Sequence, residues 1–294
     1  MTPPFGRVLT AMVTPFDVDG AIDHQAVWDL AAHLVDTGSD GIVVGGTTGE
    51  SPTLSLDEKV ALFRDVVEAV GDRAVVIAGT GTYDTAESRH LTRLACEGGC
   101  AGVMAVTPYY SRPPQQGLFE HFTAIADASS VPVLLYNIPS RTGRLIEVET
   151  LVRLSAHERI VAVKDAVGDL AFTTRTRVAC PDEFAIYSGD DTLTLPMMAV
   201  GAVGVVSVAT HLAGEQVAAL VSAAASGDWD EARRLHLALT PLFGALFVEP
   251  NPIPVKAALD AMWRPVGRPR LPLVAASAET VDLVKEALAT ARNA

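Results

Sequence analysis

Lysines are few in this chain, and one of them stands where the surrounding pattern predicts a buried strand. Only four lysines occur among 294 residues, and Lys164 directly follows the apolar run Ile160–Val163. Burying an ammonium group is costly, so a lysine in such a position tends to lose its proton and becomes a nucleophilic amine. An amine of this kind can form a Schiff base with a carbonyl substrate. The alternative is a structural ion pair with the neighbouring Asp165.

The other three lysines fit the role of nucleophile less well. Lys59 and Lys285 fall in predicted amphipathic helices, where we expect solvated charges. Lys256 lies beyond the last predicted strand. If one of the four lysines is a reactive amine, the pattern therefore favours Lys164, and the ion pair with Asp165 stays the alternative interpretation of the same residue.

A second group of candidates lies in a glycine-bounded turn. The segment Gly46-Thr47-Thr48-Gly49-Glu50 follows a predicted strand and offers two hydroxyls together with backbone N–H groups. Such donors suit a small carboxylate. The same segment could be a tight strand-to-helix connection whose glycines supply backbone freedom alone. It is not a nucleotide P-loop, since no Gly-Lys-Ser/Thr follows.

Aromatic and basic side chains complete the candidates. Tyr109, Tyr110 and Tyr136 are three of only five tyrosines, and all three fall at the ends of predicted strands. A phenol there can relay protons, although packing at the rim would use the same residues. Arg141 follows a Pro-Ser turn, and its guanidinium can clamp a carboxylate or carry a surface charge.

Metal ligands and disulfides are not indicated by the spacing. The seven histidines form no pair at ligand spacing, and adjacent acids such as Asp190 and Asp191 more often cap a helix than bind a cation. The three cysteines, Cys96, Cys100 and Cys180, are too few and odd in number for a disulfide framework. We therefore predict no metal, no disulfide and no external cofactor.

Positioning these groups requires a framework of strands and helices. Short runs rich in Val and Ile recur eight times, each followed by a polar turn and a helix-period segment, as a parallel sheet covered by helices requires. In a (β/α)8 barrel the functional residues lie at the C-terminal ends of the strands, which is where the candidates fall. A doubly wound open sheet is the alternative arrangement. The runs are Val8–Phe16, Gly41–Gly46, Ala74–Thr80, Ala101–Pro108, Val131–Pro139, Ile160–Ala166, Phe184–Asp190 and Gly204–Ala209.

The helical segments begin at recognisable signals. Ser55 and Glu58 have capping-box spacing, and Gly71 stands where a C-cap glycine belongs. We predict an α/β barrel over residues 1–227 and a C-terminal helical appendage over 228–294, since no flexible linker separates them. Predicted helices also span Asp23–Asp36, Asp84–Glu97, Gln115–Ala128, Leu212–Ala225, Trp229–Phe247 and Ala278–Ala291.

Composition narrows the classes of partner and location. The formal net charge is -13, with 22 basic and 35 acidic side chains, which argues against nucleic acid as a partner. No segment approaches the roughly 20 apolar residues needed to cross a bilayer, and residues 1–9 carry no secretory pattern. We expect a cytoplasmic protein whose partner is a small molecule or another protein.

Six ordered motifs together resemble the dihydrodipicolinate synthase (4-hydroxy-tetrahydrodipicolinate synthase) family, from about Val8 to the last helix. Any one of them would be weak, but the ordered set is specific. The motifs are Gly46-Thr47-Thr48-Gly49-Glu50-Ser51, Thr107-Pro108-Tyr109-Tyr110, Tyr136-Asn137-Ile138-Pro139-Ser140-Arg141-Thr142-Gly143, Val163-Lys164-Asp165, Ser188-Gly189-Asp190-Asp191, and Glu249-Pro250-Asn251-Pro252-Ile253-Pro254-Val255-Lys256.

The resemblance implies a cytoplasmic homotetramer of barrels that condenses pyruvate with L-aspartate 4-semialdehyde in lysine and diaminopimelate biosynthesis. Lys164 would form the Schiff base, and Tyr136 would exchange protons through Thr47 and Tyr110. The tyrosine matching Tyr110 reaches in from the neighbouring subunit in this family. For substrate binding, the resemblance implies four further groups: Thr48 and the backbone of Val206 for pyruvate, Gly189 in the pocket lining, and Arg141 for the semialdehyde carboxylate.

Two alternatives remain open beside this interpretation. A pyruvate-dependent lyase of a 2-keto-3-deoxy sugar acid or of N-acetylneuraminate would share the lysine and the tyrosine, and the Ser-Arg-Thr-Gly setting of Arg141 favours the synthase. A catalytically inactive barrel acting as a sensor would have lost relay residues that are present here.

The resemblance also locates a feedback site at which lysine-inhibited enzymes commonly place His and Asn. The matching positions here are Leu56, Lys59 and Tyr83, although Ser51 and Glu87 follow the pattern. A cation and a bulky ring disfavour a lysine ligand. We therefore predict insensitivity to L-lysine.

Overall fold

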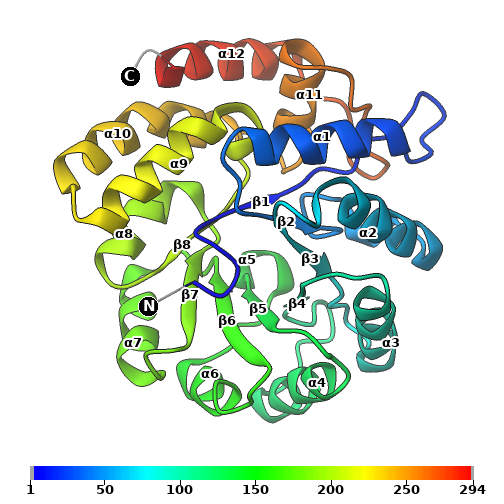
Figure 1. Cartoon of the computed structure of the whole chain (residues 1–294), viewed down its shortest axis with the longest axis vertical. Helices are drawn as coiled ribbons and strands as arrows, with labels where there is room; N and C mark the ends of the chain where they lie inside the picture. Colours follow the sequence, from blue (N-terminus) through cyan, green and yellow to red (C-terminus); the bar gives the residue numbers. More distant parts are fainter. Residues whose placement is uncertain (1–2, 293–294) are drawn as a thin grey trace.

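The computed structural model describes residues 3–292 and contains a closed barrel of eight parallel strands in sequence order (Figure 1). Strand β1 pairs with β2 on one side and with β8 on the other, with Leu9 opposite Val206, so the sheet has no free edge. This closure confirms the predicted barrel and rules out the open doubly wound sheet. The strands are β1 Val8–Ala11, β2 Gly41–Val44, β3 Val75–Gly79, β4 Gly102–Val106, β5 Val133–Asn137, β6 Ile160–Asp165, β7 Ala185–Ser188 and β8 Gly204–Ser207.

The strands form because both of their faces are buried. One set of side chains fills the barrel interior, and the alternate set packs beneath the surrounding helices. Leu9, Val43 and Leu134 belong to the interior cluster, whereas Ile42 and Val133 belong to the outer cluster. This double burial explains why the runs are continuously apolar in the sequence.

Helices surround the barrel, and local capping signals fix where several of them begin (Figure 1). The Ser55 side chain accepts from the Glu58 N–H while the Glu58 carboxylate accepts from the Ser55 N–H, so the predicted capping box is formed. Asp23 and Asp84 cap the helices that follow them. The helical elements are α1 His24–Asp36, η1 Ser51–Thr53, α2 Leu56–Val70, α3 Thr85–Glu97, α4 Gln115–Asp127, α5 Pro139–Thr142, α6 Val148–Leu154, α7 Leu170–Ala179, η2 Asp191–Leu193, α8 Thr194–Ala199 and α9 Thr210–Ser226.

Three further helices follow the barrel: α10 Trp229–Ala245, α11 Ile253–Met262 and α12 Ala278–Arg292. α10 packs against both α9 and α12 (Figure 1). Gly227 ends α9 in the left-handed conformation, with φ of 86°. The division of the chain at residues 227 and 228 stays a proposal.

The expectation that Lys59 carries a solvated charge is wrong. Its side chain is only 5% exposed on α2, and burial lowers the pKa of its ammonium, while the nearby Glu87 carboxylate raises it. Lys285 does carry an exposed charge, in an ion pair with Asp282. Among the helices of residues 3–292, none has the length and apolar character needed to cross a membrane.

Candidate active site

Lys164 and Tyr136 lie side by side at the C-terminal ends of adjacent barrel strands. Tyr136 on β5 is the register partner of Lys164 on β6. Both side chains are buried, and the Lys164 Nζ lies 4.1 Å from the centroid of the Tyr136 ring. A cation above an aromatic face is attracted by the ring quadrupole. The structure therefore places the predicted amine against a phenol at the functional end of the barrel.

The environment of Lys164 favours the neutral amine more than water does. Burial lowers its pKa to about 8, the Asp191 carboxylate opposes that shift, and the Arg141 guanidinium adds to it. A lysine with this pKa has about a tenth of its population neutral at pH 7. The group is therefore nucleophilic at physiological pH.

The proposed structural partner of Lys164, the carboxylate of Asp165, is engaged elsewhere. It accepts a hydrogen bond of 2.7 Å from the Thr173 hydroxyl and one of 3.0 Å from the Val167 N–H. Successive side chains of a strand point to opposite faces, which separates the two neighbours. A structural ion pair with Asp165 therefore does not account for the buried lysine.

Tyr136 is held as a neutral phenol next to this amine. Burial raises its pKa to about 12, while the Arg141 charge and a hydrogen-bonding interaction with the Thr47 side chain lower it. A phenol in this state carries a proton that it can donate, and Thr47 offers a hydroxyl through which the proton can pass. Lys164, Tyr136 and Thr47 thus form one connected group.

The second threonine of the turn and Arg141 are both held by Asn251. The Asn251 Nδ2 donates to the Thr48 Oγ1 at 2.9 Å, and the Arg141 Nη2 donates to the Asn251 carbonyl at 3.3 Å. Because the Thr48 oxygen accepts from the amide, its hydroxyl proton is free to be donated to a ligand. Two candidate carboxylate-binding groups are therefore linked through one residue of the appendage.

Gly189, at the end of β7, lies against the Lys164 side chain. Its N–H donates to the Asp165 carbonyl at 2.8 Å, and a Cβ added to it would lie 3.0 Å from Lys164 Cγ and 3.1 Å from Lys164 Cε. Only glycine therefore fits here without displacing the lysine. Val206 is buried on β8, where it pairs with Leu9 of β1.

A pocket of about 210 Å³ opens at this end of the barrel, and the predicted residues contribute to it unequally. Thr47, Tyr136 and Arg141 line it together with Tyr109, whereas Tyr110 is 95% exposed. The remaining lining residues are Gly45, Gly46, Ser51, Pro52, Gly79, Gly81, Met104, Val106, Ile138 and Thr142.

Sequence reasoning assigned no site role to Asn251 or Asp191. The Asp191 carboxylate is buried; its Oδ2 accepts from the Val208 N–H at 3.0 Å and the Ala209 N–H at 3.1 Å, and its charge acts on Lys164. Lys256 was discounted, yet its side chain is only 1% exposed. The sequence contained one indication that Lys256 is buried, because this lysine lies within the largely apolar segment Ile253–Met262.

The fold and this site define the class of (β/α)8-barrel proteins that carry a desolvated lysine at the C-terminal end of the sheet. A model of the dihydrodipicolinate synthetase family matches residues 4–291. The chain therefore belongs to that family, which confirms the resemblance seen in the motifs.

Individual relatives are similar in sequence to this chain over nearly its whole length. The 4-hydroxy-tetrahydrodipicolinate synthase of Moorella thermoacetica is 55% identical over 284 residues, which cover 97% of each chain. The enzyme of the same name from Synechococcus elongatus is 53% identical, over 98% of this chain and 95% of its own.

Solved structures show the same similarity. A dihydrodipicolinate synthase of Bacillus anthracis superposes with a TM-score of 0.94 at 48% identity, covering 98% of this chain and 99% of its own. The lysine-bound enzyme of Cyanidioschyzon merolae gives a TM-score of 0.96 at 45% identity, with the same coverage.

Proposed function

We propose that this protein condenses pyruvate with L-aspartate 4-semialdehyde to give 4-hydroxy-tetrahydrodipicolinate, a step of lysine and diaminopimelate biosynthesis. The observation that carries the proposal is the buried Lys164, with a pKa lowered to about 8, against the protonated phenol of Tyr136. Relatives that are 51–55% identical over nearly the whole chain carry the name of this synthase.

The first step is formation of a Schiff base. The neutral Lys164 amine attacks the ketone carbon of pyruvate, and loss of one water leaves a protonated imine. The imine withdraws electrons from the adjacent methyl group, so a methyl proton can be removed to give an enamine. Tyr136 would exchange the protons of these steps through Thr47 and Tyr110.

The second stage forms a carbon–carbon bond and then a ring. The enamine carbon attacks the aldehyde carbon of the semialdehyde, and the resulting alkoxide takes up a proton to become the hydroxyl of the product. The amine of the semialdehyde then attacks the imine carbon and displaces Lys164, which leaves as the free amine. One water is released overall, from the first step.

Substrate binding follows from the groups around the lysine. Both substrates carry carboxylates, so hydroxyls, backbone N–H groups and a guanidinium are suited to hold them. Thr48 and the backbone of Val206 would bind pyruvate beside Gly189. Arg141, whose side chain lines the pocket, would bind the carboxylate of the semialdehyde.

The assembly belongs to the proposal as well. Tyr110 is 95% exposed and adopts a φ of 68°, a backbone conformation that is uncommon for a non-glycine residue. Its ring therefore points away from its own subunit, which supports the family arrangement in which this tyrosine enters the neighbouring site. We propose a homotetramer located in the cytoplasm, and the free thiols of Cys96, Cys100 and Cys180 fit a reducing compartment.

The test is to incubate the protein with pyruvate and borohydride and to map the reduced adduct by peptide mass spectrometry. We expect the adduct on Lys164, its loss in Lys164→Ala, and its retention in Lys285→Arg, which changes an exposed lysine of α12. An adduct on another lysine, or none, would contradict the mechanism.

The same preparation separates the synthase from the lyase. With pyruvate and L-aspartate 4-semialdehyde we expect the cyclic product. Release of pyruvate from a 2-keto-3-deoxy sugar acid or from N-acetylneuraminate, without formation of the cyclic product, would favour the lyase instead.

A further inference from the structure

The last residue of the Gly46–Glu50 turn, Glu50, is bound through both carboxylate oxygens by the C-terminal segment. The Oε1 accepts from the Lys256 Nζ at 2.9 Å, and the Oε2 accepts from the backbone N–H of Arg270 at 2.8 Å. Glu50 and Lys256 are 206 positions apart in the sequence, and each side chain is 1% exposed. The turn is therefore attached to the appendage by a fully buried ion pair.

The Lys256 ammonium is fully satisfied in this position. Besides Glu50, it donates to the Thr14 carbonyl at 2.9 Å and to the Arg268 carbonyl at 3.3 Å. It also lies 4.2 Å from the centroid of the Phe16 ring. An ammonium has three donors, so every one has an acceptor. Because all three N–H groups of the Lys256 ammonium are engaged, we assign it to holding neighbouring groups in place and not to proton transfer.

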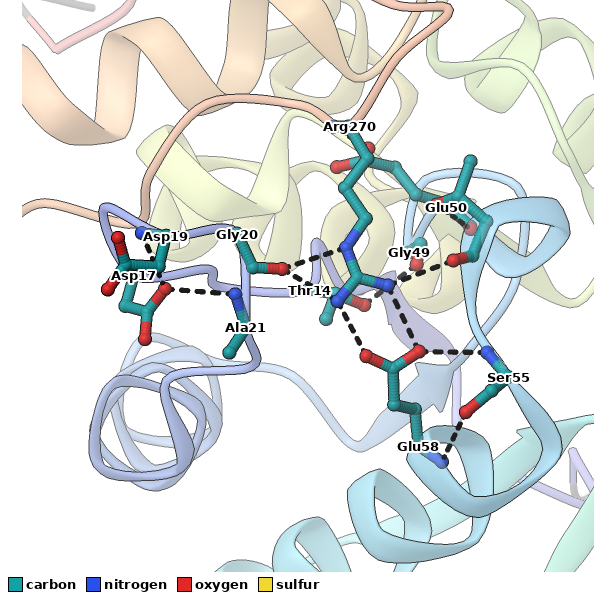
Figure 2. Close-up of polar contacts among 11 residues, drawn as sticks. Thr14, Asp17, Asp19, Gly20, Ala21, Gly49, Glu50, Ser55, Glu58 and Arg270 are labelled. Atoms are coloured by element: carbon teal, nitrogen blue, oxygen red, sulfur yellow. Dashed lines mark hydrogen bonds and ion pairs between the residues drawn. The ribbon is translucent and has the colours of Figure 1, made fainter.

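A second, more exposed bridge runs from the same segment to α2. The Arg270 guanidinium donates to both carboxylate oxygens of Glu58, at 2.5 and 3.0 Å, and to the Gly20 carbonyl. Figure 2 shows Arg270 between the Asp17–Ala21 loop and the segment that carries Glu50 and Glu58. The buried pair is therefore the inner part of a larger cluster that joins three parts of the chain.

The hydrogen bonds of Glu50 reach Thr47 through the backbone. The Glu50 N–H donates to the Thr47 carbonyl at 3.1 Å, and Glu50 adopts the left-handed conformation, with φ of 57°. That conformation is disfavoured for a side chain of this kind, so it persists only where contacts such as these hold it. The Glu50 carboxylate is therefore connected to the Thr47 carbonyl through the backbone of Glu50 itself.

The residues between Thr47 and Glu50 are held by further side chains. The Thr14 hydroxyl donates to the Gly49 carbonyl at 2.7 Å, and Asn251 donates to Thr48. The Thr14 carbonyl also accepts from Lys256, so Thr14 joins the ammonium to the turn. Three consecutive residues of the turn are thus fixed by groups that do not touch the pocket.

We propose that Glu50 and Lys256 are positioning residues, which hold the Thr47–Thr48 turn in the geometry that binds pyruvate and orients the Tyr136 phenol. The proposal rests on the proposed function, because it assigns the turn to pyruvate. It differs from a purely stabilising ion pair, which would support the fold without affecting how the site binds its substrate.

The experiment compares Glu50→Gln, Lys256→Met and the double variant. Each single change leaves a buried charge without its partner, so we expect both to lower the melting temperature. The double variant removes both charges, so we expect it to recover much of the lost melting temperature. Its turn still lacks the ion pair to the appendage. The pyruvate concentration that half-saturates borohydride trapping on Lys164 should rise by about tenfold or more in all three.

The melting temperature and the half-saturating pyruvate concentration together test whether Glu50 and Lys256 position the turn. The positioning role is overturned if the half-saturating pyruvate concentration of the double variant returns to the wild-type value along with the melting temperature. It is also overturned if Glu50→Gln leaves the half-saturating pyruvate concentration unchanged. The double variant keeps the test valid should a single variant fail to fold.

The matched control is Asp40→Asn, which alters a carboxylate at the opposite end of the barrel. Asp40 accepts from the N–H groups of Arg7 and Val8 at 2.7 and 2.9 Å. We expect this variant to lose stability with unchanged half-saturation. Trapping needs no semialdehyde, so failure of the wild type to form the cyclic product would contradict the proposed function while this comparison still stands.

Discussion

Lys164 combines two opposing electrostatic influences in one buried position. Burial, the main cause, and the Arg141 charge lower its pKa, whereas Asp191 raises it. Arg141 is needed near the substrate carboxylate in the proposed mechanism, so its effect on the lysine is unavoidable. The Asp191 carboxylate offsets part of the effect of Arg141 on the lysine pKa. It also stabilises the protonated imine, which carries the same positive charge as the ammonium.

A pH profile tests this balance at the level of single residues. In the proposed mechanism only the neutral Lys164 amine attacks pyruvate, so we expect kcat/KM for pyruvate to rise with pH and to level off above about 8. Removing the Asp191 charge disfavours the ammonium and lowers the lysine pKa further. Asp191→Asn should therefore shift the rising limb to lower pH, measured by steady-state assays across pH.

The neighbouring carboxylate provides the control for that profile. Asp190 caps η2 by accepting from the Thr192 N–H at 2.8 Å, and its charge acts on Asp191 but is not among those that act directly on Lys164. Asp190→Asn therefore removes an adjacent charge and leaves the Asp191 carboxylate in place. Its rising limb should match the wild type. A shift of equal size in both variants would contradict a specific role for Asp191.

Residues differ in how far the sequence could predict them. Lys164 was predictable because a charged residue inside a buried strand is unusual whatever surrounds it. Asn251 was not, because an asparagine in a turn is ordinary and its bond to Thr48 joins positions 203 apart. The roles of such residues depend on tertiary contacts that no local pattern reports.

At the scale of elements, helix starts were predicted more accurately than strand ends. Capping depends on side chains within four residues, which is why the α2 capping box was visible in the sequence. The run Val8–Phe16 overestimates β1, which ends at Ala11, because Met12, Val13 and Phe16 remain buried after the chain leaves the strand ladder. Burial therefore continues where strand pairing stops.

The expected response to L-lysine depends on helices α2 and α3 and on the end of the loop between β3 and α3, where Tyr83 lies. Lys59 on α2 is buried with its charge near Glu87 of α3, and Tyr83 packs edge-on against Tyr109 with ring centroids 5.2 Å apart. A ligand ammonium would meet a resident cation and a ring instead of open acceptors. We expect no inhibition of the condensation by L-lysine up to millimolar concentrations in a steady-state assay.

Lys59→Asn provides the comparison for that result. Removing the resident cation should leave Glu87 open to a ligand ammonium, so this variant should become more sensitive to L-lysine than the wild type. Inhibition of the wild type at sub-millimolar L-lysine would overturn the prediction.

At the scale of the whole molecule, the active end of the barrel depends on the chain that follows it. Asn251, Lys256 and Arg270 all return to the turn after β2, although the appendage packs mainly on α9. The barrel and the appendage therefore share the site, even though the sequence pattern separates them at residue 228. Truncation after α9 would remove these contacts together.

In the proposed tetramer the exposed Tyr110 would link catalysis to assembly, and mixing two inactive variants tests that link. If each site uses Tyr110 of a neighbouring subunit, a Tyr110→Phe subunit keeps its own Lys164 and regains a tyrosine from a Lys164→Ala partner. Coexpression with two affinity tags should give hetero-oligomers with about a quarter of wild-type activity when mixing is random, because half of the pairs are mixed and each has one complete site. Each variant alone should be strongly impaired. Hetero-oligomers no more active than the separate variants would show that Tyr110 does not act across the interface, and its exposure in the single subunit would then need another explanation.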